Sequence, residues 1–235
     1  MLVLALDTTT RAGSCALARD GRVLRENVSD AERGHAERLP GDLAALLERE
    51  GVPLGDVDVF AVATGPGSFT GLRIGIATMQ GLAVAMGKPL VGVSALDALA
   101  DLGVRRPGAA EQGIDVTRTR RVATWVDAWR GEVYAALYEH GREVDAPTVS
   151  RPETLLEQMR EDVLFIGDGA ATFRDLIVHT IGERAQFAEA IAPPLAGTIA
   201  RLATDAARAG ETPPPHAIRP LYVRRPDPVL ARERR

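Results

Sequence analysis

The first residues that could carry chemistry lie in an Asp-Thr-rich turn near the start of the chain. Asp7 is followed by Thr8, Thr9 and Thr10, directly after the apolar residues 2–6. A carboxylate in this position could face a metal ion while the hydroxyls face a phosphate. Alternatively, Asp7 could accept hydrogen bonds from its own turn, as aspartate often does. The sequence leaves both interpretations open.

A glycine-rich segment is the second candidate. Residues 65–71 read Gly-Pro-Gly-Ser-Phe-Thr-Gly between a strand pattern and a helix pattern. Glycines permit backbone conformations closed to other residues, and successive N–H groups at a helix N-terminus can bind an anion. The same glycines could serve only a tight, closely packed turn. If a phosphate binds here, we expect it to contact Asp7, Thr8, Gly65, Gly67 and Ser68.

Other kinds of site find less support. Asp127, Asp168 and Arg130 stand near strand ends in the second half of the chain, and the strand-end pair Asp7 and Asp127 resembles that of two-lobed phosphotransferases. None of the four histidines is paired at helical spacing, and the single cysteine, Cys15, lies in a strand pattern. We therefore predict no metal site.

The elements that must position these residues follow a repeated strand and helix order, which predicts an α/β fold with a mixed sheet. In the first half we predict strands at 2–6, 14–19, 22–28, 57–63 and 89–93, and helices at 36–50, 72–86 and 94–102. The strands at 14–19 and 22–28 flank Asp20-Gly21, a strong hairpin signal. In the second half we predict strands at 122–127, 132–139, 142–149 and 163–166, and helices at 152–160, 170–181 and 195–207.

A charged, aperiodic segment at 105–121 contains proline and glycine and separates the two halves. We therefore predict an N-terminal lobe at 1–104, a reduced second lobe at 122–218 and a basic tail at 219–235. The tail holds six arginines against two acidic residues, a net charge of +4. It could be a solvated terminus or could contact RNA or an acidic partner.

Two predicted helices carry apolar stripes. In 36–50 the leucines recur at helical spacing, and in 72–86 the apolar residues repeat like a heptad. Gly75 and Gly81 cost roughly 1 kcal/mol each relative to alanine inside a helix, so close packing should compensate for them. The stripes could be buried within the chain or could bind a partner. The predicted partner or dimer interface comprises Leu39, Leu43, Leu46, Leu47, Phe69, Leu72, Ile76, Met79, Ala83 and Met86.

Composition narrows the class of protein. The 235 residues are 46% hydrophobic and 26% charged, which is typical of a globular chain, and one cysteine excludes a disulfide scaffold. A net charge of −4 argues against strong autonomous binding of nucleic acid. No apolar run approaches the ~20 residues of a membrane span, and the start of the chain lacks the basic region of a signal peptide. We expect a cytoplasmic protein without membrane association.

Seven segments over nearly the whole chain carry a family resemblance. They read LALDTTT at 4–10, GHAERL at 34–39, DVFAVATGPGSFTGLRIGIATMQGLA at 58–83, VGVSALDAL at 91–99, VDAWRGEVYAALY at 126–138, IGDGA at 166–170 and PLYVR at 220–224. Together they resemble the TsaB family, also called YeaZ, of bacterial tRNA threonylcarbamoyladenosine biosynthesis proteins. GPGSFTGLRxG is the most specific motif. The chain departs from the family at Trp129, which stands between Asp127-Ala128 and Arg130 where the family reads Asp-Ala-Arg.

The resemblance implies a two-lobed actin/sugar-kinase/Hsp70-like fold, also described as ribonuclease-H-like, with a reduced second lobe. TsaB-like proteins are related to the catalytic subunit TsaD, which carries a metal-binding histidine pair on a helix. This sequence has no such pair. The resemblance therefore implies a chain with no catalytic residues and no cofactor of its own, whose partner subunits use ATP and metal.

The implied role is that of a scaffold that binds TsaD in a complex with the ATPase TsaE. The complex transfers a threonylcarbamoyl group to N6 of adenosine 37 in ANN-decoding tRNAs, so this chain would meet tRNA mainly through the complex. The family dimerises through the helices that correspond to 36–50 and 72–86, which could also form a self-dimer.

Two alternative functions remain at this stage. A small-molecule phosphotransferase of the actin-like ATPase superfamily would use Asp7 and its threonines for phosphate, but it would need a fuller second lobe. A metallopeptidase would need the missing histidine pair.

Overall fold

The computed structural model describes residues 1–105 and 121–224, and these residues form two compact units. The units are Met1–Ala98 with Pro194–Leu221, and Leu99–Pro193 with the chain from Tyr222 onward.

This division differs from the predicted lobe boundaries: residues 99–104, predicted in the first lobe, belong to the second unit, and residues 219–221, predicted in the tail, belong to the first. Residues 194–218 were predicted in the second lobe, but those from Pro194 onward return to the first unit. Residues 106–120, which make up most of the predicted boundary segment, and 225–235, which make up most of the predicted tail, lie outside the described residues.

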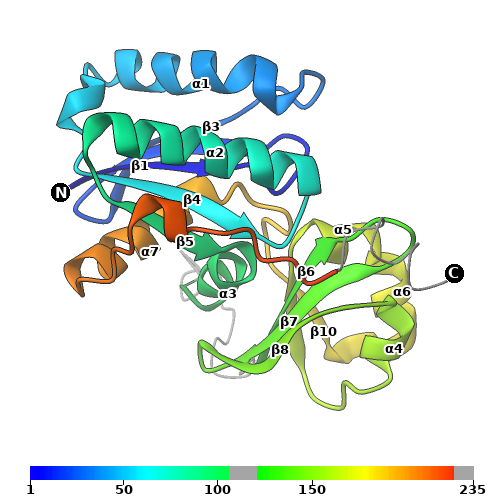
Figure 1. The fold of residues 1–235 in the computed structure, drawn as a ribbon. Coiled ribbons are helices and arrows are strands. Elements are labelled where there is room, and N and C mark those ends of the chain that lie inside the picture. The colour runs from blue at the N-terminus through cyan, green and yellow to red at the C-terminus, as the bar shows by residue number, and fades with distance from the viewer. Residues whose placement is uncertain (106–120, 225–235) are drawn as a thin grey trace, which may run out of the picture. The chain divides into compact units, whose positions relative to one another are not determined.

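The first unit is built on a five-stranded mixed sheet (Figure 1). Its strands are β1 (Leu2–Asp7), β2 (Ser14–Arg19), β3 (Arg22–Val28), β4 (Val59–Gly65) and β5 (Leu90–Ser94). They lie in the order β3-β2-β1-β4-β5, with β1 antiparallel to β2 and parallel to β4. The predicted hairpin is confirmed: Asp20 and Gly21 both have positive φ, as a type I′ turn requires.

Helices cover both faces of the first sheet. α1 (His35–Arg49) and α2 (Phe69–Met86) lie side by side on one face, and α7 (Ala196–Arg208) lies on the other (Figure 1). Because side chains alternate along a strand, Leu4 of β1 joins the core under α1 and α2, whereas Val3 is buried on the opposite side. Burial on both faces explains why β1 and β4 read as continuous apolar runs.

α7 belongs to the first unit because its apolar stripe packs on the first sheet. The buried members of that stripe are Ala196, Ile199, Ala200 and Ala203. The N–H groups of Leu195 and Ala196 donate to Ser14 Oγ at 3.3 and 3.0 Å, and that of Gly197 donates to Glu26 Oε1 at 2.8 Å. The helical period of α7 predicted a helix, but it carried no information on which sheet the helix covers.

The second unit repeats the topology of the first. Its strands are β6 (Arg121–Asp127), β7 (Val133–Glu139), β8 (Arg142–Ser150), β9 (Val163–Ile166) and β10 (Ala185–Phe187). The order is β10-β9-β6-β7-β8, so a central strand again starts an antiparallel meander and pairs on its other side with parallel strands. The helices of this unit include α4 (Pro152–Leu156), α5 (Asp168–Thr172) and α6 (Arg174–Ile181), and α3 (Ala95–Arg105) spans the division between the units.

Most predicted elements are confirmed to within three residues at each end, and the differences fall in the second unit. The helix predicted at 152–160 ends at Leu156, and the helix predicted at 170–181 is broken at Phe173 into α5 and α6. Phe173 packs against the second core cluster, so the break brings its ring toward the interior. The three-residue strand β10 was missed because so short a segment shows no alternation.

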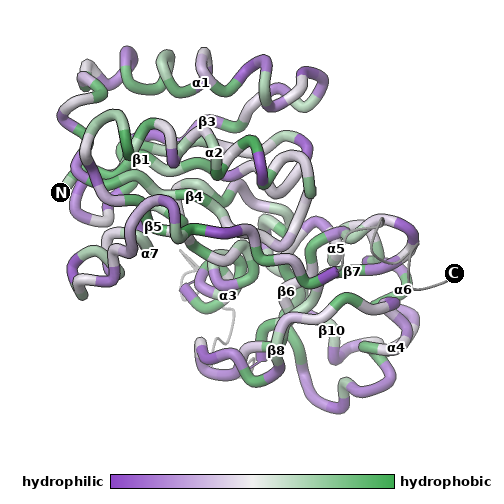
Figure 2. The backbone as a smooth tube through the Cα atoms, in the orientation of Figure 1, coloured by the Kyte–Doolittle hydropathy of each residue, from purple (hydrophilic) through white to green (hydrophobic). Residues whose placement is uncertain are grey.

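α2 is long and apolar enough, by length and composition alone, to cross a membrane. Figure 2 shows apolar residues along the strands and along the sides of the helices. One side of α2 is buried through Leu72, Ile76, Met79 and Ala83, as expected for a core helix.

Candidate functional site

The Asp-Thr turn after β1 is held by the side chain of Asp7. This buried carboxylate accepts hydrogen bonds from the backbone N–H of Thr9 at 2.9 Å and from the Thr9 hydroxyl at 2.7 Å. Both bonds reach the same carboxylate oxygen, Oδ1, and tie the side chain to its own turn. The interpretation that Asp7 stabilises its own turn is therefore confirmed.

The glycine-rich segment packs directly against this turn. The N–H of Ser68 donates to the Thr9 carbonyl oxygen at 2.8 Å. A Cβ added at Gly67 would collide with Thr9, and one added at Gly71 or Gly75 would collide with Thr8. Glycine is needed at these positions because the threonine turn occupies the space that side chains would take. This geometry supports the tight-turn interpretation of the segment.

The N-terminus of α2 is capped from within the same segment. The Ser68 side chain accepts a hydrogen bond from the N–H of Gly71 at 3.2 Å, which satisfies one of the free donors of the first turn. Gly65, Gly67 and Thr8 are buried and Ser68 is half-buried. Phosphate contact by these residues stays a prediction, and the packing of the turn leaves little of their surface exposed.

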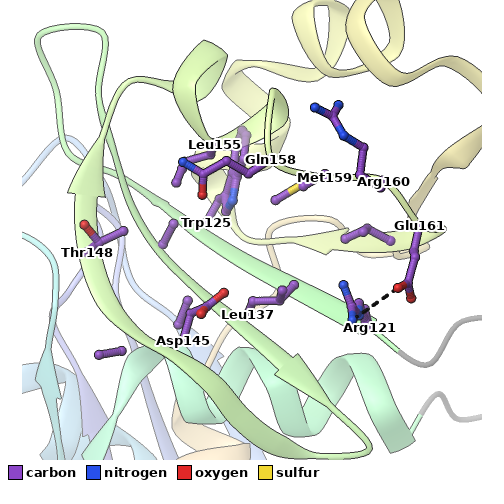
Figure 3. A pocket seen from close by; sticks show the side chains of 14 residues that line it. Arg121, Trp125, Leu137, Asp145, Thr148, Leu155, Gln158, Met159, Arg160 and Glu161 are labelled. Carbon is purple, nitrogen blue, oxygen red and sulfur yellow. Dashed lines mark ion pairs between the residues drawn. The ribbon is translucent and has the colours of Figure 1, made fainter.

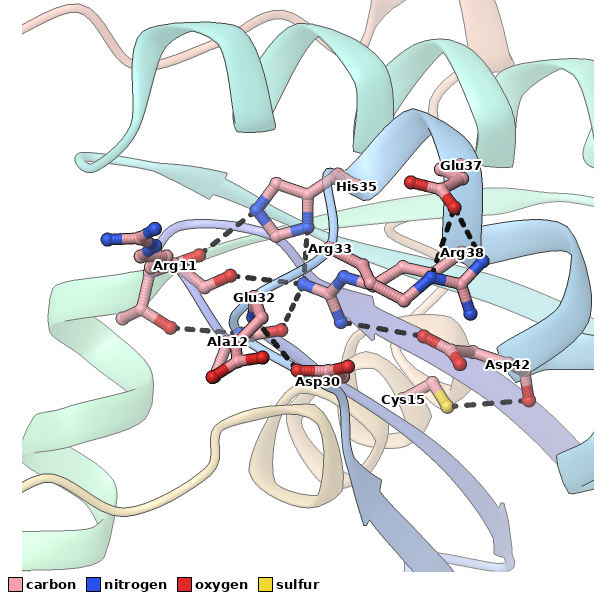
Figure 4. Close-up of polar contacts among 12 residues, drawn as sticks. Arg11, Ala12, Cys15, Asp30, Glu32, Arg33, His35, Glu37, Arg38 and Asp42 are labelled. Atoms are coloured by element: carbon pink, nitrogen blue, oxygen red, sulfur yellow. Dashed lines mark hydrogen bonds and ion pairs between the residues drawn. The ribbon is translucent and has the colours of Figure 1, made fainter.

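A pair of side chains that sequence reasoning did not single out holds the end of the Asp-Thr turn (Figure 4). The guanidinium of the buried Arg38 donates to the carbonyl oxygens of Arg11 (3.1 Å) and Ala12, and it lies 3.5 Å from the Asp42 carboxylate. His35 lies between Arg38 and the turn. The only signal for this pair in the sequence was the GHAERL motif, whose His and Arg stand three residues apart on one face of a helix.

The hydrogen bonds of His35 define its protonation. Arg38 can only donate, and its Nη2 lies 2.8 Å from Nδ1 of His35, so Nδ1 is the acceptor. Nε2 therefore carries the proton and donates to the Thr10 carbonyl oxygen at 3.1 Å. Burial and the neighbouring charge of Arg38 lower the pKa of His35. A neutral histidine thus serves as a structural link between α1 and the turn.

The structure corrects the choice of interface residues on α1 and α2. Eight of the ten predicted side chains are buried in the chain's own core, and only Phe69 and Met86 are exposed. The helical stripes face the first sheet because that sheet presents apolar residues beneath them. The buried eight are Leu39, Leu43, Leu46, Leu47, Leu72, Ile76, Met79 and Ala83.

The opposite, exposed sides of α1 and α2 carry small and apolar residues. Gly41 and Ala44 are exposed on α1, and Ala77 and Gly81 are exposed on α2. A Cβ at Gly81 would meet no atom within 4 Å, in contrast to the tightly packed Gly71 and Gly75. We define the α1–α2 surface as the exposed residues Gly41, Ala44, Phe69, Arg73, Ala77, Gly81, Val84 and Met86.

In the second unit, Asp127 and Asp168 support the ends of neighbouring parallel strands. Asp127 accepts from the N–H of Trp129 at 2.8 Å, and Asp168 accepts from the N–H of Asp127 at 3.0 Å. Burial raises the pKa of Asp168, and the nearby charge of Asp127 acts in the same direction. Trp129 and Arg130 both have positive φ in the turn that joins β6 to β7. Asp127 thus stabilises a turn after the central strand of its sheet, as Asp7 does after β1.

Arg224, in the segment 220–224, contacts the turn between β6 and β7. Arg224 donates to the Ala128 carbonyl oxygen at 2.9 Å and pairs with Glu132. It therefore holds the β6–β7 turn within the second unit. Within residues 1–105 and 121–224, no group of three or more His, Cys, Asp or Glu side chains could hold a metal ion.

Two sheets of the same topology, each with an aspartate turn after its central strand, define a two-lobed α/β protein of the actin-like ATPase class. A structural neighbour, the activator of 2-hydroxyisocaproyl-CoA dehydratase from Clostridium difficile, solved with bound ADPNP, shares this fold. It aligns with a TM-score of 0.55 over 90% of this chain and 97% of its own, at 9% identity.

Sequence comparisons identify the family within this class. A family model described as TsaD, tRNA N6-adenosine threonylcarbamoyltransferase, matches residues 28–229. The TsaB protein of Escherichia coli is 37% identical over 186 residues, 75% of each chain. The structure of YeaZ from Pseudomonas aeruginosa aligns with a TM-score of 0.73 at 34% identity, over 94% of this chain and 99% of its own. The chain belongs to the TsaB (YeaZ) family of tRNA threonylcarbamoyladenosine biosynthesis proteins.

Proposed function

We propose that this chain is a non-catalytic subunit that binds and activates a TsaD partner through the α1–α2 surface. In this proposal the complex, with TsaE, transfers threonylcarbamoyl to N6 of adenosine 37 of ANN-decoding tRNAs. ATP and metal serve the partner subunits, and tRNA is bound mainly by the assembled complex. A cytoplasmic location accompanies this role.

The observation that carries the proposal is the exposed side of α2. Gly81 lies inside a helix, where glycine costs about 1 kcal/mol relative to alanine, and a Cβ added there would meet no other part of the described chain within 4 Å. Val84, one turn further along, is 68% exposed. Small residues flanked by exposed apolar ones allow the backbone of a partner helix to approach closely and bury apolar area.

The Asp-Thr turn supports the non-catalytic part of the proposal. In a phosphotransferase of this fold, Asp7 and its threonines would have to contact phosphate. Here the Asp7 carboxylate accepts hydrogen bonds from Thr9. Thr8 and Thr9 occupy the space beside the glycines of residues 67–75. Asp7 and Thr9 are therefore engaged in holding the turn, whereas the buried Thr8 hydroxyl has no hydrogen-bond partner within the described residues.

A matched pair of valine variants tests the proposed surface. Val84 on α2 is 68% exposed and Val178 on α6 is 48% exposed, and both lie within helices. We expect Val84→Arg to abolish formation of a stoichiometric complex with the same organism's TsaD, because a charge would be buried in the interface. Val178→Arg should leave the complex intact. Size-exclusion chromatography with light scattering measures both outcomes, and tRNA threonylcarbamoylation by the mixture measures activation.

Ile76 and Met79 are unsuitable positions for this test, because both are buried and an aspartate there would unfold the first unit. The proposal is wrong if Val84→Arg binds TsaD as the unchanged chain does while circular dichroism shows both to be folded. ATP turnover with a small-molecule acceptor by the chain alone would instead favour the phosphotransferase alternative.

A further inference from the structure

A cavity of about 210 Å³ lies wholly within the second unit, between its sheet and the residues that follow α4 (Figure 3). α4 is only five residues long and ends at Leu156. A loop that includes Gln158 and Met159, and not a helix, therefore covers this part of the sheet. The cavity is the space left between that loop and the β7–β8 hairpin.

Apolar side chains form the floor of the cavity. The ring of Trp125 is held edge-on against Phe165, with ring centroids 5.2 Å apart. This contact fixes the deepest part of the floor, because edge-to-face aromatic pairs have a preferred geometry. The other apolar residues that line the cavity are Ala135, Ala136, Leu137, Ala146, Leu155, Met159 and Val163.

The irregular strand β8 places a carboxylate at the rim. Its register with β7 shifts between Ala135 and Leu137 and again between Leu137 and Tyr138. Each shift inserts one extra residue into β8, and such bulges re-aim side chains and occur often beside binding sites. Asp145 lies opposite Leu137, between the two shifts, so both side chains share one face of the sheet and line the cavity.

The charges at the rim leave one carboxylate unmatched. Arg121 forms ion pairs with Glu161 at 3.3 Å and with Glu139 at 3.7 Å. In Figure 3, Arg160 extends away from Asp145 and Leu137. The side chain of Asp145 has no hydrogen bond or ion pair within the part of the chain that the structure describes. The charged residues that line the cavity, Arg121, Arg160, Asp145 and Glu161, sum to zero, and Asp145 is the carboxylate that stands beside the apolar floor without an ion pair.

We propose that this cavity binds a small organic cation with an apolar body and a single ammonium group. The body would cover the apolar floor, and the ammonium would donate hydrogen bonds to the Asp145 carboxylate. The cavity volume is below the ~300–1,000 Å³ of pockets for drug-sized ligands, which limits the body to about one ring. All lining residues lie outside the α1–α2 surface, so the two proposals are independent.

Phenethylamine is a probe of this size and charge, and Trp125 can report its binding. The chain contains two tryptophans, so Trp129→Phe leaves Trp125 as the only tryptophan. We expect a saturable change in its fluorescence on titration with phenethylamine. Asp145→Asn in this background should weaken binding of phenethylamine about tenfold, because a charged hydrogen bond is lost. The uncharged 2-phenylethanol should bind equally well to the chains with and without the Asp145→Asn substitution. Its affinity should be lower than that of phenethylamine for the chain that retains Asp145.

A second acidic residue provides the matched control. Asp175 on α6 is exposed and does not line the cavity, so Asp175→Asn should leave the affinity for phenethylamine unchanged. The anion 3-phenylpropionate should bind more weakly than the amine. The proposal is overturned if phenethylamine gives no saturable change, if Asp145→Asn binds it as tightly as the parent chain, or if the anion binds as tightly as the amine.

Discussion

Single buried polar residues in the first unit hold its turns. Asp7 accepts hydrogen bonds from the backbone N–H and the hydroxyl of Thr9. Arg38 donates hydrogen bonds to the carbonyl oxygens of Arg11 and Ala12. His35 joins the two groups as a neutral ring. Because a buried polar group without a partner is costly, removing one member leaves the others unsatisfied. These residues are therefore expected to affect stability before they affect any binding event.

The pH dependence of stability should follow His35. Its pKa is lowered in the folded chain from the ordinary value of 6.5, so the unfolded chain takes up a proton first as pH falls. Stability from this residue is complete above about pH 6.5 and is lost as pH falls toward the lower folded pKa. Urea unfolding at several pH values should show this loss. His35→Gln should flatten the dependence in that window, and His179→Gln, at an exposed position on α6, should not. An unchanged slope in His35→Gln would contradict this assignment.

At the scale of elements, α2 has two sides with different tasks. Its buried side places Gly71 and Gly75 against Thr8, so the helix lies close to the turn after β1. Its exposed side carries Gly81, where an added Cβ would have open space around it within the described chain. The same residue type therefore serves internal packing at one position and, in the proposed function, a partner at another.

Alanine substitutions should separate these two tasks. Gly75→Ala should destabilise the chain by about 1–3 kcal/mol, because its Cβ would collide with the Thr8 hydroxyl. Gly81→Ala should stabilise the isolated chain by about 0.5–1 kcal/mol, because alanine is the better helix former and the space is open. Urea unfolding measures both free energies. Equal effects at the two positions would show that the glycines do not differ as described.

At the scale of the whole molecule, each unit contains a sheet of the same topology. The chain does not finish the first unit before it forms the second. α7 returns from the end of the second unit to cover the first sheet. Its Ile199 is fully buried there, and loss of such a side chain alone costs roughly 2–5 kcal/mol out of the ~5–15 kcal/mol of a typical domain.

A truncated chain should reveal this dependence. A chain that ends at Pro193 lacks α7 and exposes the apolar face of β1 and β4. We expect strands β1–β5 of this shorter chain to lose protection from hydrogen exchange, and we expect the chain to aggregate. A chain that ends at Arg224 should retain the protection. If the chain ending at Pro193 protects β1–β5 like the full chain, α7 does not stabilise the first unit.

The sequence by itself determined the order of elements, the Asp20-Gly21 hairpin, the glycine turn before α2 and the family. These features depend on short-range rules, such as side-chain period, turn chemistry and specific motifs. Only the tertiary structure decided that Leu43 and Met79 are core residues, that Gly75 packs on Thr8 while Gly81 is open, and that α7 returns to the first sheet. The reason is that periodicity defines an apolar face, whereas long-range packing decides what covers it.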